Sequence, residues 1–342
     1  MCLGILRGNP LTIDNSGGYN YKMEILPSYI KLYESGELHK RRDYLMKRLK
    51  KCDLCPRQCK VNRLTNVGTC RVGNEIKISE YVLYPGEEPV LQGENGAGGI
   101  FFSNCTMRCV YCQNFNFSQL GFGKNISTID LAEIFLKFQN EMKAANLDLV
   151  TATPYLPFIF DALIYAIERG FRLPIVWNTS SYERIDTLKL MEDVVDIYLA
   201  DIRYTSNIVS KRYSGVNDYW SNTQLAVKEM YRQIGETFIV DEKSNILKRG
   251  IIIRILVLPN LINQAKEALK FLKYDVSEKV HVSLMDQYVP VYKAKNYEKL
   301  SRYLYKSEYQ EVVDYLYELG FENGWIQTHN LKENDEVFST SQ

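Results

Sequence analysis

The 342-residue sequence has no uninterrupted apolar run of the roughly 18 residues needed to cross a membrane. Its first residues, MCLGILRGNPLTIDNSGG, lack the charged-then-apolar order of a signal peptide. Net charge is nearly absent as well, because 42 Lys and Arg stand against 41 Asp and Glu. These absences argue against a membrane protein and against a basic nucleic-acid binder, and they predict a cytoplasmic location.

Histidine is scarce, occurring only at positions 39, 281 and 329. His281 opens the apolar stretch HVSLMDQYVP, where we expect it to pack in the core. Cysteine, in contrast, occurs eight times, and a cytoplasmic compartment keeps thiols reduced. We therefore interpret the cysteines as metal ligands or catalytic groups rather than as disulfides. Cys2 stands apart from the others and is expected to be a free thiol without a role.

The composition, 46% hydrophobic and 24% charged, is that of an ordinary globular protein. The pattern divides the chain into three parts. Residues 1–95 form a helical leader and a cysteine-rich, metal-binding extension. Residues 96–290 form the main α/β unit, and residues 291–342 form a C-terminal helical extension.

Within the main unit, apolar strands alternate with single helices, which predicts parallel pairing with right-handed crossovers. About six such units favour a partial TIM barrel, although alternation alone also allows a doubly wound sheet. In either architecture, ligands bind at the C-terminal ends of the strands. The expected strands are 100–103, 147–153, 173–180, 194–202, 249–259 and 280–290.

Three cysteines, Cys105, Cys109 and Cys112, lie in FFSNCTMRCVYC, directly after the first of these strands. A structural zinc ion needs four ligands, and so do most iron–sulfur clusters. Three thiolates on one loop can hold three irons of a 4Fe–4S cluster and leave the fourth iron open to a substrate or cofactor. Such an open position is what distinguishes a reactive metal site from a structural one.

The string CTMRCVYCQN resembles the radical S-adenosylmethionine (SAM) superfamily, whose signature is C-x3-C-x-aromatic-C, with Tyr111 at the aromatic position. The resemblance implies that the three cysteines ligate a 4Fe–4S cluster and that SAM chelates the unique iron. It further implies reductive cleavage of SAM to a 5′-deoxyadenosyl radical, which abstracts hydrogen from a substrate. It also implies a partial TIM barrel.

Together with the upstream CDLCPRQCKVNRLTNVGTC and the later LMDQYVP, the chain is similar to an uncharacterised branch described as pyruvate formate-lyase activating enzyme-like, over about residues 50–330. The branch name implies activation of a glycyl radical. A small molecule or a protein or peptide remains open as the substrate, and the reductant is expected to be a low-potential donor such as ferredoxin or flavodoxin. The chain departs from the branch at TATP, where TPTP is expected, and at Ile255, where a histidine is expected.

The resemblance places SAM contacts at strand ends. Thr151 and Thr153 are expected to meet the methionine amino group, Asn178 and Ser180 the ribose hydroxyls, and Arg254 the methionine carboxylate. For each of these residues, ordinary strand-end capping or an ion pair is the alternative.

Two further groups are expected at the mouth of the barrel. Asp201 and Arg203 face it or pair with each other. Gln287 and Tyr288 line the substrate side, and Tyr288 is a candidate hydrogen-atom relay that more simply packs.

A second set, Cys52, Cys55, Cys59 and Cys70, offers four ligands. It fits either a structural zinc ion, which contributes folding energy, or an auxiliary 4Fe–4S cluster that serves as an electron relay or substrate anchor.

Two functions outside the SAM class also stay open. One is an electron-transfer or metal-scaffold protein that uses both cysteine sets without SAM. The other is a zinc-ribbon nucleic-acid binder built on residues 40–71, against which the near-neutral charge argues.

Overall fold

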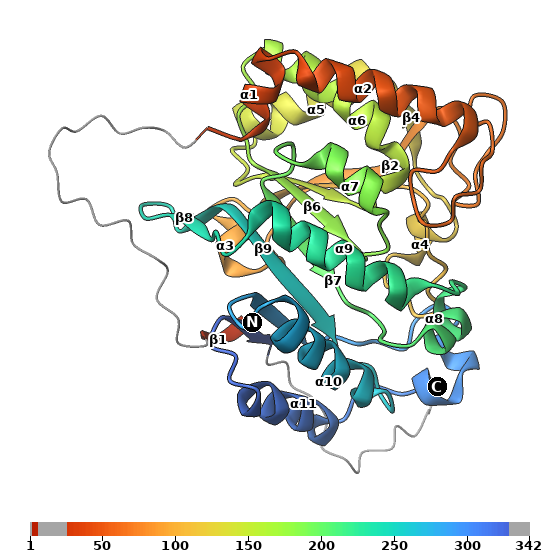
Figure 1. The fold of residues 1–342 in the computed structure, drawn as a ribbon, viewed down its shortest axis with the longest axis vertical. Coiled ribbons are helices and arrows are strands. Elements are labelled where there is room, and N and C mark those ends of the chain that lie inside the picture. Colours follow the sequence, from red (N-terminus) through yellow and green to blue (C-terminus); the bar gives the residue numbers. More distant parts are fainter. Residues whose placement is uncertain (1, 6–25, 328–342) are drawn as a thin grey trace, which may run out of the picture.

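The computed structural model describes residues 2–5 and 26–327, and one sheet runs through them (Figure 1). Its strands are β1 (Cys2–Ile5), β2 (Ile76–Tyr84), β3 (Ala97–Phe102), β4 (Lys124–Ile126), β5 (Leu147–Val150), β6 (Ile175–Thr179), β7 (Ile197–Asp201), β8 (Ile239–Asp241), β9 (Ile246–Leu256), β10 (His281–Met285) and β11 (Gly324–Gln327). They lie in the order β1-β11-β10-β9-β7-β6-β5-β3-β2-β4, with β8 paired to β9.

The strands from β3 to β11 on this path pair in parallel and follow one another in chain order. A doubly wound sheet reverses its strand order at a switch point, so the observed order excludes that alternative. Antiparallel strands β2 and β4 end one edge and β1 ends the other, which leaves the barrel open. The α/β partial barrel predicted from the sequence is confirmed.

Six helices form the crossovers between parallel strands: α5 (Thr128–Asn140), α6 (Leu156–Glu168), α7 (Ile185–Met191), α9 (Tyr219–Ile234), α10 (Ile262–Phe271) and α11 (Lys306–Glu318). The remaining helices are α1 (Tyr29–Glu34), α2 (Glu37–Arg48), α3 (Pro89–Gln92), α4 (Phe115–Ser118) and α8 (Asn207–Ser214). Ser127 caps α5, since its hydroxyl accepts from the Asp130 amide at 3.1 Å. The Asp130 carboxylate accepts from the Ser127 amide in return, which satisfies two donors of the first turn.

The two faces of the sheet carry separate cores, because neighbouring side chains on a strand point to opposite faces. Tyr198 and Ile253 join the outer core with the helices, whereas the adjacent Leu199 and Ile252 join an inner cluster. That inner cluster fills the barrel toward the N-terminal ends of the strands, together with Leu91 of α3. A different inner cluster, rich in tyrosine, lies at the C-terminal ends.

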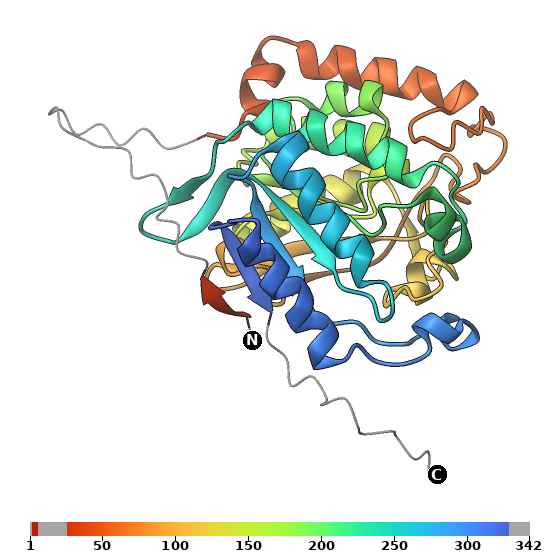
Figure 2. The ribbon, with the colours of Figure 1, turned by 60° about the horizontal axis from the view of Figure 1, so that its bottom comes forward.

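The sheet includes strands from outside residues 96–290, the bounds that the sequence analysis gives to the main α/β unit. β2 belongs to residues 1–95 and pairs with β3, while β11 belongs to residues 291–342 and pairs with β10. As far as residue 327, the C-terminal extension therefore contains the strand β11 as well as α11 and two 3-10 helices, Ala294–Asn296 and Glu298–Leu300, and residues 328–342 lie outside the described part. Figure 2 shows β1 beside β11 at this edge. Cys2 lies in β1, and its side chain is outside the described part.

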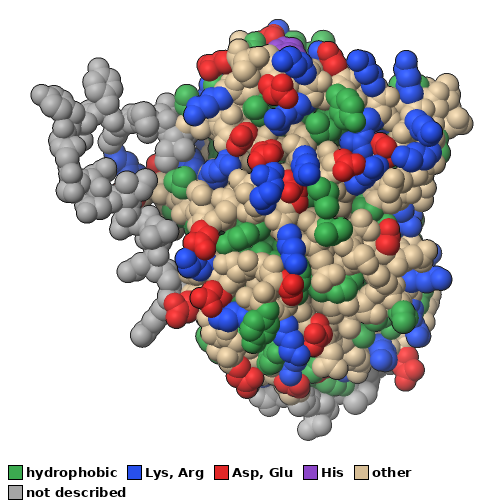
Figure 3. All heavy atoms as spheres, in the orientation of Figure 1, with side chains coloured by type: hydrophobic (Ala, Val, Ile, Leu, Met, Phe, Trp, Pro, Cys, Tyr) green, Lys and Arg blue, Asp and Glu red, His purple; other side chains and the backbone are tan. Residues whose placement is uncertain are grey.

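At the other end of the molecule, α1 and α2 pack over α6 (Figure 1), where Arg42 of α2 forms an ion pair with Asp161. On the face seen in Figure 3, acidic and basic side chains are interspersed rather than gathered by sign. Of the helices described, none combines the length and the apolar character needed to span a membrane.

Candidate functional site

The cysteine loop, residues 105–112, leaves the C-terminal end of β3 and turns through Asn104, whose φ is +67°. Backbone hydrogen bonds hold it at both sides of the barrel mouth. The amides of Arg108 and Val110 donate to the carbonyls of Ser214 and Tyr213, each at 2.9 Å, and Val110 accepts from the Lys293 amide at 2.8 Å. The loop is thereby fixed over the carboxyl ends of the parallel strands, where an α/β site is expected.

The three thiols of the cysteine loop are buried or half-buried and lie close enough to affect one another's pKa. The Ser214 hydroxyl donates to Cys109 Sγ at 3.0 Å, and Ser118 Oγ lies 3.1 Å from Cys112 Sγ. Burial, together with the neighbouring thiols of Cys112 and Cys105, raises the pKa of Cys109 to about 12 against the lowering effect of Arg203. Thiols in such surroundings become thiolates when a metal centre supplies positive charge.

In the described part of the chain, no group of three or more His, Cys, Asp or Glu side chains is arranged to hold a single metal ion. This holds for the cysteine loop and for the four-cysteine segment, residues 52–70.

A layer of tyrosines packs around the cysteine loop. The ring of Tyr111 lies 6.3 Å from that of Tyr204 and 5.8 Å from that of Tyr288, centroid to centroid. The hydroxyl of Tyr288 donates to the Leu300 carbonyl at 2.6 Å, so this side chain packs and anchors a backbone segment. Nearby, Gln113 donates to the Gln287 carbonyl at 2.7 Å and ties the loop to the end of β10.

Close to the tyrosines lies a layer of buried and half-buried charges. Arg203 and Asp201 form an ion pair at 2.5 Å, and Arg203 is close enough to affect the pKa of Cys109. Arg254 Nε donates to Glu88 at 2.8 Å, and its Nη2 bonds both Glu88 and Glu87. The guanidinium expected to bind the SAM carboxylate thus already holds two carboxylates of its own chain.

Burial, with Glu87 and its negative charge alongside, raises the pKa of Asp148 well above its usual range. Asp148 projects from β5 beside Arg254 and accepts a hydrogen bond from Asn178 at 3.3 Å. The layer therefore holds more carboxyl groups than guanidinium groups, and a protonated Asp148 reduces that excess.

The other predicted SAM contacts lie at the expected ends of β5 and β6 but already have partners. The Thr151 hydroxyl donates to the Phe102 carbonyl at 2.8 Å, and that of Thr153 donates to Glu183 at 2.5 Å. The carbonyl of Ser180 accepts from the Tyr219 hydroxyl at 2.8 Å. Asn178 and Ser180 remain partly exposed.

Glu183 is a buried carboxylate that the sequence analysis did not single out. Its Oε1 accepts hydrogen bonds from Thr153, Thr179 and Trp177, while Oε2 has no partner. Burial raises its pKa despite these bonds. Only its position four residues past the end of β6 could have drawn attention to it.

The histidine at the start of β10 is half-buried and packs against an aromatic ring, which agrees with the packing role expected from the sequence. His281 stacks on Phe238 with ring centroids 3.5 Å apart, and burial lowers its pKa to about 4. It lies at the N-terminal end of its strand, the end opposite the cysteine loop.

The four-cysteine segment folds its thiols around one small cavity, lined by Cys52, Cys55, Cys59 and Cys70. All four are free rather than disulfide-bonded. The backbone reaches this shape through residues in the left-handed region, with φ of +38° at Gln58, +57° at Lys60 and +67° at Arg71. Non-glycine residues seldom adopt such φ values, so the turns of this segment depend on the surrounding contacts.

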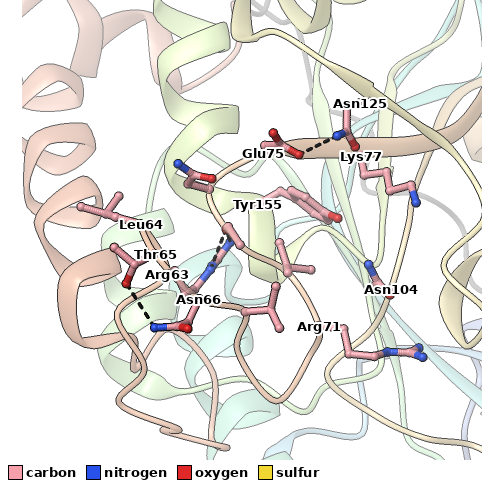
Figure 4. Close-up of a pocket in the computed structure, with 14 residues that line it drawn as sticks. Arg63, Leu64, Thr65, Asn66, Arg71, Glu75, Lys77, Asn104, Asn125 and Tyr155 are labelled. Atoms are coloured by element: carbon pink, nitrogen blue, oxygen red, sulfur yellow. Dashed lines mark hydrogen bonds between the residues drawn. The ribbon is translucent and has the colours of Figure 1, made fainter.

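A wider hollow of about 390 Å³ lies beside this segment, lined by Arg63, Arg71, Lys77 and Tyr155 among others (Figure 4). Its cations are already bonded to backbone oxygens. Arg63 donates to the Gly73 carbonyl at 2.6 Å, and Lys77 to that of Gly121 at 2.6 Å. The hollow contains none of the cysteines.

Arginines link the four-cysteine segment to the cysteine loop. Arg108 donates to the Cys105 carbonyl at 2.7 Å and to the Thr69 carbonyl at 2.6 Å, and so reaches from one set to the other. Arg57 donates to the Thr106 carbonyl at 3.0 Å from the opposite direction. The two cysteine sets are thus neighbours in space, although at least 35 residues separate them along the sequence (105 − 70).

Comparison with solved structures finds similarities at low identity. The Streptococcus suis protein SuiB bound to the precursor peptide SuiA is 13% identical with a TM-score of 0.44, over 66% of this chain and 47% of that protein. Native anSMEcpe with bound AdoMet and Cp18Cys peptide is 12% identical with a TM-score of 0.43, over 63% and 56%. The chain spans about half the length of these two proteins.

No family model matches the chain. Among curated proteins, the uncharacterized protein MJ0674 of Methanocaldococcus jannaschii is 32% identical over 273 residues. The match covers 78% of this chain and 74% of that protein. The chain therefore belongs to the family of the uncharacterized protein MJ0674.

Proposed function

We propose that the chain is a radical SAM enzyme whose cysteine loop holds a 4Fe–4S cluster with one iron left for SAM. The observation that carries the proposal is the loop itself. Three thiols, with the aromatic Tyr111 of the superfamily signature before the last of them, follow the C-terminal end of β3 and lie close enough to affect one another's pKa. No fourth cysteine of the described residues joins them in the tyrosine-rich inner cluster.

The chain's residues fit such a cluster. Soft thiolates are the ligands that iron–sulfur clusters use, and hydroxyls of Ser118 and Ser214 lie within hydrogen-bond distance of two of the sulfurs. Arg203 contributes a positive charge near Cys109, which favours the thiolate form. When bound, the cluster supplies the electron for cleavage of SAM to methionine and a 5′-deoxyadenosyl radical.

The protein's own contribution is positioning and the exclusion of water. The cysteine loop is fixed by backbone hydrogen bonds to α8 and to the segment after β10. Buried Tyr111, Tyr204 and Tyr288 surround it with rings. A reactive radical needs such a closed site, because water and stray hydrogen donors would divert it.

Among the predicted SAM contacts, Asn178 and Ser180 are the ones we propose for the ribose hydroxyls, since both remain partly exposed at the end of β6. Thr151, Thr153 and Arg254 would have to exchange their present partners to meet the methionine moiety. We propose these three only as contacts formed after such an exchange.

The substrate gives up hydrogen to the radical and is a small molecule or a peptide or protein side chain. Activation of a glycyl radical is the reaction that the branch resemblance suggests. A low-potential donor such as ferredoxin or flavodoxin supplies the electron.

The test is anaerobic reconstitution with iron and sulfide, followed by electron paramagnetic resonance (EPR) of the reduced protein with and without SAM. We expect SAM to shift the signal and 5′-deoxyadenosine to form in the wild type but not in Cys105→Ala. Cys2→Ala serves as the matched cysteine control and should behave as wild type. An unshifted signal without deoxyadenosine would instead support a metal-scaffold or electron-transfer protein.

A further inference from the structure

We propose that residues 52–77 and 104–125 together form a docking surface for the electron donor, a small one-electron carrier protein with an acidic surface. The donor's role rests on the function proposed above, whereas its binding can be measured without that function. Three features carry the proposal: the charge of the two segments, the apolar side chains that they expose, and their contacts with the cysteine loop.

Positive charge is concentrated in these two segments. Residues 52–77 contain five Lys and Arg against two Asp and Glu, and residues 104–125 contain two Lys and Arg and no acid. Their net charge is therefore +5 (7 − 2), and the rest of the chain carries −4 (1 − 5). An acidic partner is attracted to this part of the chain rather than to the remainder.

Most of these cations are not neutralised by carboxylates. Five of them donate to backbone carbonyls, which carry no net charge: Arg57, Arg63, Arg71, Lys77 and Arg108. Within the described residues, the acids of the two segments have other partners. Asp53 forms ion pairs with Lys60 and with two arginines outside the segments, and Glu75 accepts from Asn125. Metal held by the thiolates would add its own charge, but the exposed Arg71 and Lys124 stay positive at the surface.

Apolar side chains are exposed at the wider hollow beside the four-cysteine segment. Leu64 and Val67 line this hollow, and both are exposed. Arg71 and Lys77 line it as well (Figure 4). Exposed apolar side chains among cations are typical of a surface that another protein covers, because a small anion would leave the apolar groups in water.

A second exposed apolar stretch, residues 119–122, lies beside the same hollow. Arg71 and Lys77, which line the hollow, donate to backbone carbonyls of this stretch. Its side chains Leu120 and Phe122 are exposed. The apolar side chains of the two segments therefore belong to one surface, with cations between them.

Contacts lead from this surface to the cysteine loop. The Arg71 guanidinium donates to the Ser118 carbonyl at 3.4 Å, and the Ser118 hydroxyl lies 3.1 Å from Cys112 Sγ. Arg108 also bridges the two segments. A carrier bound here gives one electron to the metal centre of the cysteine loop. The carrier is oxidised by one electron and the centre is reduced by one, with no bond made or broken.

The test measures binding of oxidised flavodoxin and of oxidised ferredoxin to the full-length protein by isothermal titration calorimetry. We expect at least one of these carriers to bind, with a Kd that rises with ionic strength. Lys124→Glu should weaken that binding about tenfold, because it replaces an attraction by a repulsion. Lys243→Glu is the matched control, since Lys243 is an exposed lysine between β8 and β9, at the N-terminal end of β9. It should leave the Kd within about twofold of wild type.

A second pair of variants tests the apolar part of the surface. Phe122→Ser should also weaken binding about tenfold, whereas Tyr274→Ser should not. These aromatic side chains are 61% and 74% exposed, so neither substitution opens a core. Binding that neither Lys124→Glu nor Phe122→Ser weakens overturns the proposal. Absence of binding by both carriers overturns it too, including the case in which single-stranded RNA binds this surface instead.

Hydrogen exchange of the wild type keeps the proposal testable if a variant does not fold. The bound carrier should slow exchange of backbone amides in residues 62–71 and 113–125, and slowing confined to other segments would overturn the proposal.

Failure of the docking surface and failure of the proposed function give different results. With dithionite as the reductant, Lys124→Glu should form deoxyadenosine at the wild-type rate, and with the reduced carrier about tenfold more slowly. Equal carrier-driven rates refute only the docking surface. No deoxyadenosine from wild type and dithionite refutes only the proposed function, and the calorimetry, which needs no SAM, still decides whether this surface binds an acidic carrier.

Discussion

At the scale of single residues, the surroundings of Tyr288 favour packing over the role of a hydrogen-atom relay. Its ring lies against the signature tyrosine Tyr111 and its hydroxyl is donated to the Leu300 carbonyl. We expect Tyr288→Phe to keep SAM cleavage near wild-type rates and to lower the free energy of unfolding by about 1 kcal/mol, the value of one buried hydrogen bond. Deoxyadenosine yield and urea unfolding measure both effects, and loss of substrate turnover at normal SAM cleavage would restore the relay role.

A second residue-scale prediction concerns Asp196, which accepts the backbone amides of Ser28 and Ile175, each at 3.0 Å. Burial raises the pKa of Asp196 to about 6, above the roughly 3.9 of an unfolded chain. The folded state therefore binds the proton more tightly, and this group makes stability fall as pH rises from about 4 to 6.

Asp196→Asn removes that titration. Relative to wild type, the variant should gain about 2 kcal/mol of unfolding free energy between pH 4 and pH 7. Denaturant unfolding at several pH values measures the difference, in which the titrations shared by both proteins cancel. A difference that stays constant with pH would show that Asp196 titrates normally.

At the scale of elements, the edge strand β11 depends on one glycine. Gly324 has φ of +128°, and a Cβ there would overlap the Val282 carbonyl oxygen of β10. We expect Gly324→Ala to cost about 3 kcal/mol or more, because backbone atoms rather than a flexible side chain must move. Gly170→Ala is the matched control, since its φ is +88° but no atom lies within 4 Å. Equal losses in thermal unfolding would mean that backbone conformation alone sets the cost.

The same strand, β11, is also an element that the sequence pattern did not predict. The strands from β3 to β10 on the parallel path were predicted, because each is an apolar run bounded by a helical segment. β11 has four residues, too few to show a period, and it follows a helix in the part expected to be a helical extension. β1 is equally short. Their pairing depends on the edge that β10 offers, which no local pattern contains.

At the scale of the whole molecule, we expect metal bound by the two cysteine sets to contribute unevenly to stability. The barrel has its own cores, while the stretch between Cys59 and Cys70 exposes Leu64 and Val67. Removing the metal with a chelator should therefore loosen residues 52–70 first. We expect trypsin to cut at Lys60 and Arg63 roughly tenfold faster in the metal-free protein, with later cleavage of the barrel. Mass spectrometry of the fragments measures this, and equal rates with and without metal would contradict it.

By itself, the sequence determined the α/β class, the two cysteine sets and the position of the cysteine loop, because spacing and periodicity are local properties of the chain. It did not determine whether the sheet is barrel-like or doubly wound, since that depends on the order in which strands pair. It also left the partners of Arg254 and Thr153 undetermined, because Glu87, Glu88 and Glu183 reach them only after folding. Tertiary structure alone placed Arg108 between the two cysteine sets. Contacts between distant segments form only when the chain folds. A local sequence pattern therefore cannot predict them.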